Sequence, residues 1–193
     1  QLMWPWGHAA FGYVLYSLSS RLTDDPGVTG RDVLVLAVAT QLPDLVDKSA
    51  AWVFDVFASG YAAGHSLFVA LPVGLAIYGL AQRRDSESLG LAFVVGYWSH
   101  LAGDVLLAIL LDKPYTVGKV LWPLVIFPGS EDPAGAITTV MGFLVAFLEL
   151  LVTAEDPTVF VAFFGPPLAA IALWLVDGAP GLRELYQWAV RSE

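Results

Sequence analysis

The sequence contains no cysteine, few charged residues and only three lysines, and each absence excludes something. Without cysteine the chain can form no disulfide, no thiolate metal site and no cysteine nucleophile. Charged residues make up 14% of the chain, against roughly 25% in soluble domains. The net charge of −9 excludes the basic surface that nucleic-acid binding requires. A composition rich in aspartate and poor in lysine is typical of a halophilic source.

Apolar residues take the place of the missing charges. They make up 57% of the 193 residues, and the mean hydropathy is +0.68. Runs without a charged residue cover 1–20, 56–82, 88–103, 133–148 and 157–176, and several approach the roughly 20 residues that cross a bilayer. The pattern predicts an all-α, polytopic membrane helix bundle that forms one domain over residues 1–193. A soluble all-helical core is the alternative, and the lengths of the runs disfavour it.

Gly and Pro clusters divide the chain into six predicted hydrophobic helices, the second of them short. The predicted ranges are 7–22, 32–45, 65–82, 89–111, 134–152 and 158–176. A small amphipathic piece is predicted at 50–57, and the loop at 112–133 either dips into the membrane or covers a site. Residues 180–191 predict a C-terminal amphipathic helix that lies at the membrane interface.

Arginines suggest how the bundle is oriented. Arg21 and Arg31 flank the first loop, and Arg83 and Arg84 begin the third. If successive helices alternate in direction, these loops share one side of the membrane, and the excess of arginine predicts that this side is cytoplasmic. Lysines and two further arginines lie on the opposite side, so the two sides differ little in their number of positive charges. The chain is therefore expected to be an integral protein of the cell membrane.

Five polar residues interrupt the apolar helices at a similar depth: His8, Asp44, His65, His100 and Asp104. At ~1.5 Å per residue, each lies about 20–27 Å from the arginine-bearing side of a bilayer core that is ~30 Å thick. They come from four different predicted helices. We expect them to meet in one layer near the extracytoplasmic face.

Imidazole and carboxylate groups together are the ligands that Zn²⁺ and similar ions prefer in a site without cysteine. A bound cation would also offset carboxylate charges that a low dielectric penalises. His100 and Asp104 are four residues apart, so both can ligate from one helical face. The sequence therefore predicts a site for one or two divalent ions, most readily zinc. A hydrogen-bonded packing pair, a proton relay or an ion pathway are the alternatives.

Three nearby polar residues have secondary roles in this prediction. Asp47 is the candidate catalytic base, with a partner of a ligand or a solvated loop carboxylate as alternatives. Ser66 is expected to cap a helix. Lys48 either meets a phosphate group or extends to the membrane interface.

The motifs "WGHAAFGY", "LPDLVDK", "GHSLF", "GYWSHLAGD" and "GKVLWP" also carry a resemblance. In this order, over about residues 4–123, they resemble the YdjM-like family of membrane-bound metal-dependent hydrolases. That family is in turn similar to the superfamily of zinc-dependent phospholipase C and single-strand nuclease, whose ligands follow the order His, Asp, His, His-x-x-x-Asp. His8, Asp44, His65, His100 and Asp104 reproduce this order. No histidine follows Asp104, so the resemblance implies fewer ions than in the soluble enzymes.

The resemblance implies a membrane-embedded hydrolase that cleaves a phosphoester with a metal-activated water. Its expected partners are membrane lipid and a small or lipid-like phosphoester. A metal- or proton-handling transport protein is the rival from another class, and it would need a polar pathway through both halves of the membrane. A structural scaffold, in which the polar layer only fixes helix packing, is the third reading.

Overall fold

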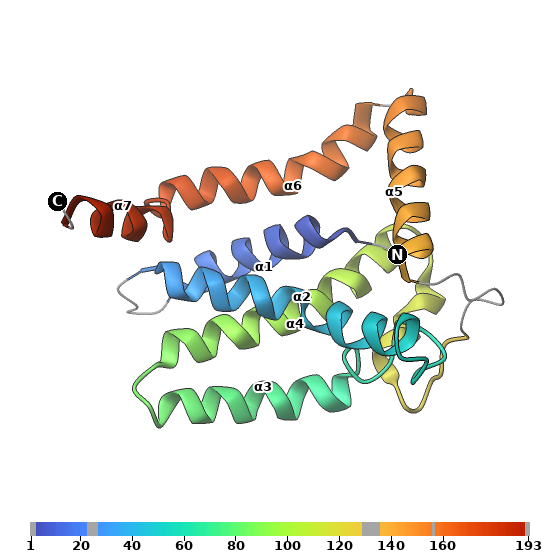
Figure 1. The fold of residues 1–193 in the computed structure, drawn as a ribbon, viewed down its shortest axis with the longest axis horizontal. Helices are drawn as coiled ribbons and strands as arrows, with labels where there is room; N and C mark the ends of the chain where they lie inside the picture. Colours follow the sequence, from blue (N-terminus) through green and yellow to red (C-terminus); the bar gives the residue numbers. More distant parts are fainter. Residues whose placement is uncertain (1–2, 23–26, 129–135, 156, 192–193) are drawn as a thin grey trace.

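The computed structural model describes residues 3–22, 27–128, 136–155 and 157–191, and these residues form helices and no strand (Figure 1). The all-α prediction is therefore confirmed. The elements, in order, are α1 Pro5–Ser20, α2 Gly30–Trp52, α3 Leu67–Gln82, α4 Glu87–Leu110, the 3-10 helix η1 Pro114–Leu121, α5 Ala136–Thr153, α6 Pro157–Val176 and α7 Leu182–Arg191.

The first four helices form an antiparallel bundle with α4 at its centre, packed against α1, α2 and α3. The α1–α2 and α3–α4 connections lie at one end, on the left of Figure 1, and the α2–α3 connection and η1 lie at the other. Successive helices of the bundle thus alternate in direction, which is the condition on which the orientation argument depends. Arg21 and Arg83 follow the last residues of α1 and α3, so the arginine-bearing loops share one end.

Small residues let the central helices approach closely. A Cβ atom at Gly12 of α1 would lie 2.5 Å from Thr40 Cγ2 and 2.9 Å from Ser99 Oγ. A Cβ atom at Gly96 of α4 would lie 2.8 Å from Ala39 Cβ. Because neither glycine has a side chain, α1, α2 and α4 pack tightly against one another and bring their polar residues within reach.

Many large apolar side chains lie on the outside of the molecule, while several ionisable ones are buried. Leu34, Leu75 and Ile109 are exposed on α2, α3 and α4. An exterior of this kind suits lipid and not water. Among the described residues, however, only α4 is long and apolar enough to cross a membrane. The stretches Leu67–Gln82, Ile137–Thr153 and Phe163–Val176 are apolar but shorter, so six spans are not confirmed.

The helix α6 is fastened along α1 by one carboxylate, Asp177, in the turn that follows α6. It accepts hydrogen bonds from Tyr13 Oη at 2.8 Å and from Ser17 Oγ at 2.6 Å, and it forms an ion pair with Arg21 at 2.6 Å. We call this group the Asp177 cluster. Helix α5 is held differently, because Phe147 packs on Trp4 and Trp6 with ring centroids 4.7 and 5.5 Å apart.

Two predicted segments differ from the structure. The second helix is not short: it begins at Gly30, where Thr29 and Asp32 form a capping box, and it continues through Pro43 to Trp52. Proline removes only one hydrogen bond from the ladder, and the packing of α2 on α4 outweighs that loss. The separate amphipathic piece at 50–57 is therefore wrong, since its first residues belong to α2 and the rest is irregular.

The loop at 112–133 contains η1, which packs against α4. Ser66 Oγ donates a hydrogen bond to the carbonyl of Trp122, so this segment covers the end of the bundle where the α2–α3 connection lies. Residues 134–135, the predicted start of the fifth helix, lie outside the described residues.

Candidate metal centre

The five predicted ligands meet at the end of the bundle that η1 covers. His8 comes from α1, Asp44 from α2, His65 from the segment before α3, and His100 and Asp104 from α4. The three histidines are at most 1% exposed, and Asp104 is 8% exposed. Two overlapping groups of these side chains offer ligand atoms close enough for one ion: His8, Asp44 and His100, and His65, His100 and Asp104.

The distances between the facing atoms are those of neighbouring ligands around a metal. His100 Nε2 lies 3.2 Å from His65 Nε2, and Asp44 Oδ1 lies 3.3 Å from His65 Nε2 and 3.8 Å from His100 Nε2. Asp104 Oδ1 lies 3.6 Å from His8 Nε2, and Asp104 Oδ2 lies 3.9 Å from His65 Nε2. Two ligands that each bind zinc at ~2.0–2.1 Å in a tetrahedral site are about 3.4 Å apart. The cluster has this spacing.

Hydrogen bonds on the far side of two rings decide which nitrogen faces inward. His65 Nδ1 lies 2.8 Å from Asp47 Oδ2, and His100 Nδ1 lies 2.6 Å from the carbonyl oxygen of Thr40. A carboxylate and a carbonyl can only accept, so each Nδ1 carries the hydrogen and donates it. In the neutral rings, the lone pairs of the two Nε2 atoms then point at each other across 3.2 Å.

A cation between the opposed lone pairs would relieve their repulsion, and the surrounding carboxylates favour one. The carboxylates of Asp44 and Asp47 lie against the His65 ring and favour a positive charge at this position. A metal ion bound by the facing nitrogens would supply that charge.

His8 completes the cluster from the other side. Its ring stacks on His100 with the centroids 3.7 Å apart, and its buried Nδ1 has no hydrogen-bond partner. A buried polar atom without a partner costs free energy. This unpaired nitrogen is consistent with a bonding partner that the protein atoms do not supply.

Asp47 is buried and holds the segment before α3. Its carboxylate accepts hydrogen bonds from the backbone N–H groups of Ala62 at 2.7 Å, Gly64 at 2.7 Å and His65 at 3.0 Å, and from the His65 ring. Of the alternatives for Asp47, these contacts favour the partner that orients a ligand. They give no support to the solvated carboxylate and leave no free oxygen for the base.

Close packing around Asp47 explains the glycine before His65. A Cβ atom at Gly64 would lie 2.8 Å from the carbonyl oxygen of Pro43 and 3.1 Å from Asp47. Ser66 caps α3 by accepting from the N–H of Phe68 at 3.2 Å, which confirms the predicted cap. The peptide that carries His65 is therefore fixed on both sides.

Three contributors to this region were missed from sequence. The Thr40 carbonyl gave no signal, because any residue has one. Tyr61 lies in an irregular segment, and its ring packs edge-on against His65 with centroids 4.8 Å apart. Lys119 belongs to the motif "GKVLWP", whose spacing alone gave it no role.

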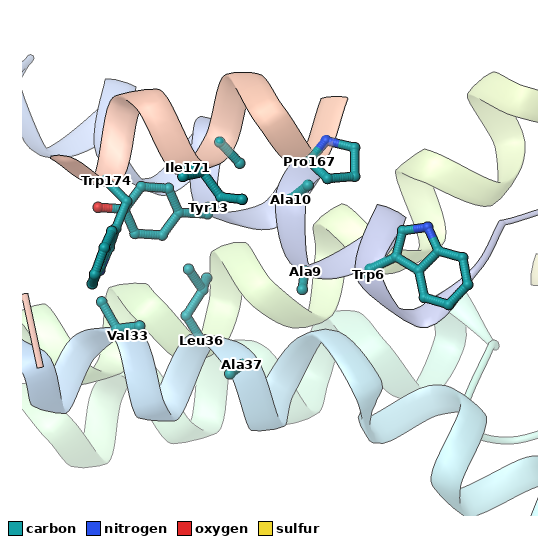
Figure 2. Close-up of a pocket in the computed structure, with 11 residues that line it drawn as sticks. Trp6, Ala9, Ala10, Tyr13, Val33, Leu36, Ala37, Pro167, Ile171 and Trp174 are labelled. Atoms are coloured by element: carbon teal, nitrogen blue, oxygen red, sulfur yellow. The ribbon is translucent and has the colours of Figure 1, made fainter. Parts of the chain in front are cut away.

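A separate cavity of about 310 Å³ lies between α1, α2 and α6 (Figure 2). Trp6, Tyr13, Leu36, Pro167 and Trp174 are among its lining residues, and the lining is almost entirely apolar. The α1 residues that line it follow a helical face that does not include His8. The cavity is therefore not part of the polar cluster.

Comparison with known proteins adds one finding. The chain matches a family model described as YdjM inner membrane protein over residues 3–176. No curated protein and no solved structure matches the chain.

Proposed function

Because the chain belongs to the YdjM inner membrane protein family, we propose that it is a membrane-embedded, metal-dependent hydrolase of phosphoesters. In the buried cluster, His8, Asp44, His65 and His100 hold the metal, for which zinc is the expected ion, and Asp104 lies beside it. A lipid-like phosphoester is the expected substrate.

The main support for a bound metal is the pair of facing Nε2 atoms of His65 and His100. Each ring is fixed by a hydrogen bond on its own Nδ1. A hydrogen bond from the second ring nitrogen to a carboxylate or carbonyl is typical of metal-ligating histidines. The two possible ligand groups share His100. Since His100 has only one free nitrogen, the arrangement favours one ion over two.

A divalent ion in this position would act as a Lewis acid, lowering the pKa of a water molecule and withdrawing charge from a phosphoryl oxygen. The residues of the chain would orient the metal ligands and accept a proton from the water. Asp47 would hold the His65 ring in place. Asp104 borders the centre from the covered end and contacts two histidines, so it replaces Asp47 as the group that takes a proton from water.

A lipid-like substrate is supported by the membrane family and the apolar exterior. The resemblance of the motifs to phospholipase C supports a phosphoester. A transport protein would need polar groups along the whole bundle. Both ends of the bundle hold buried polar groups, but the core between them, which includes Ala10, Leu36 and Ala92, is apolar and favours the hydrolase.

The test is metal content and phosphoesterase activity of the purified protein in detergent. We expect about one zinc per chain by elemental analysis, and hydrolysis of phospholipid or phosphatidate. His100→Ala and Asp104→Ala should each lose activity, and His100→Ala should also lose the zinc. Asp177→Asn, a substitution at the distant end of the bundle, serves as the matched control and should keep both.

Two outcomes count against the proposal. A wild-type protein without stoichiometric metal would favour the structural scaffold. Bound metal without hydrolysis of any lipid phosphoester, together with ion flux in liposomes, would favour the transport protein.

A further inference from the structure

Two lysines lie on the outer edge of the cluster, and the first of them is Lys48. It follows Asp44 by one turn of α2, and its ammonium group forms an ion pair with Asp44 Oδ2. The other oxygen of the same carboxylate, Oδ1, faces His65 and His100. Only 13% of the Lys48 side chain is exposed. One carboxylate thus separates a largely buried cation from the inner face of the centre.

Lys119 approaches the same edge from η1. Its Nζ lies 3.7 Å from the centroid of the Tyr61 ring and 5.7 Å from that of Phe127. Tyr61 in turn packs against His65. Within the part of the chain that the structure describes, no carboxylate lies within ion-pair distance of Lys119. A cation that is half-buried on an aromatic ring without an anion is in an unusual position for a lysine.

The electrostatic surroundings connect Lys119 to the centre. Burial lowers the pKa of Lys119, and the charge of Asp104 opposes that effect while Lys48 adds to it. Lys119 therefore lies within the field of both Asp104 and Lys48. The aromatic contact and these charges place it beside the cluster and not on a distant surface.

The two lysines change the net charge of the centre. Asp44, Asp47 and Asp104 with one divalent ion leave the centre with one negative charge, which would repel an anionic substrate. Lys48 and Lys119 convert this into one positive charge. A neutral ester or glycoside would leave the ammonium group of Lys119 half-buried and unpaired, whereas a phosphate group would pair with it.

We propose that Lys48 and Lys119, with Tyr61 as the platform under Lys119, form an anion-recognition edge that binds the phosphoryl oxygens of the substrate. This inference rests on the proposed function, because it assigns the substrate class of the same centre. The lysines act in binding and specificity, while the metal ligands remain the cluster residues. The shared chemistry is a phosphate group, either free or on a lipid.

The experiment measures phosphate binding and zinc content on the same zinc-loaded samples in detergent. The probes are inorganic phosphate, followed by calorimetry, and phosphatidic acid in mixed micelles, with phosphatidylcholine micelles as the blank. Lys119→Met keeps the aliphatic stem and removes the charge, and Lys119→Arg keeps the charge. Lys113→Met, an exposed lysine just before η1, is the matched control.

We expect Lys119→Met and Lys48→Met to weaken binding by about tenfold each, the size expected for hydrogen bonds to charged groups, at unchanged zinc content. Lys119→Arg should restore binding, and Lys113→Met should not change it. Tighter binding of phosphatidic acid than of inorganic phosphate identifies a lipid headgroup, and the reverse order identifies a free phosphate.

The inference is overturned if Lys119→Met binds both probes as tightly as the wild type while holding the same zinc. It is also overturned if the zinc-loaded wild type binds neither probe, in which case the metal centre itself still stands. A wild type that holds no zinc refutes the proposed function. Phosphate binding that still depends on Lys119 would then support an anion site without a metal.

Discussion

The two ends of the bundle each bury carboxylate groups, but they treat them in opposite ways. At one end Asp177 receives donors from Tyr13, Ser17 and Arg21, so its negative charge is fully matched by the protein. At the other end two imidazole nitrogens face each other, and a buried ring nitrogen of His8 has no partner. A matched cluster fastens helices together, whereas a cluster of facing acceptors could hold a metal ion.

Removal of the metal should produce the largest difference between the two ends. Treatment with a chelator should lower the free energy of unfolding by about 4 kcal/mol if free zinc was held near 1,000 times its dissociation constant. The physical reason is that zinc binds the folded cluster and not the unfolded chain. Thermal unfolding in detergent, with and without chelator, measures the shift.

His100→Ala is the control, because a variant without the central ligand should show no shift with chelator. An equal shift in wild type and variant would mean that the chelator acts elsewhere, and the contrast between the ends would be lost.

Loss of the carboxylate behind His65 should have the next largest effect. Asp47→Asn replaces an acceptor of several N–H groups with an amide that can no longer accept at both atoms. We expect zinc affinity to fall by about 10–100-fold, as for other partners that orient a metal-ligating histidine. Competition with a zinc-sensitive dye measures the affinity.

The exposed Asp55, in the segment after α2, offers the comparison: Asp55→Asn should leave zinc affinity unchanged. Unaltered affinity in Asp47→Asn would show that its hydrogen bond to His65 does not orient a ligand.

The smallest effect is expected at the other end of the bundle. Asp177→Asn should lower the free energy of unfolding by about 2 kcal/mol near neutral pH, because it removes hydrogen bonds to a charged group, and it should leave zinc content unchanged. Denaturation of chelated protein measures this term without any contribution from the metal.

The effect of Asp177→Asn should also depend on pH. Burial alone would raise the pKa of Asp177, but the donors Ser17, Tyr13 and Arg21 outweigh it and hold the pKa below its usual range. Its stabilisation is therefore present above the unfolded value of about 4 and is lost as the pH falls through the lower folded value. A difference between wild type and variant that stays constant down to the lowest pH would contradict a charged Asp177.

Prediction from sequence succeeded where composition and the length of an apolar run decide the local structure. Apolar runs gave helices close to α1, α3, α4, α5 and α6. Prediction failed at α2, because Pro43 was read as a helix end although packing on α4 carries the helix past it. Depth along each helix predicted that the five polar residues share a layer, and the structure brings them together there.

The amino-acid sequence by itself determined the helical class, the apolar exterior and the identity of the imidazole and carboxylate groups, because these follow from composition and periodicity. Only the tertiary structure decided which nitrogen of each ring faces inward. It also decided that the oxygens of Asp47 accept hydrogen bonds from the backbone and from His65, and that Lys119 lies over the Tyr61 ring. Each of these depends on contacts between segments far apart in the chain, such as Thr40 with His100. The spacing of residues within one helix carries no information about such contacts.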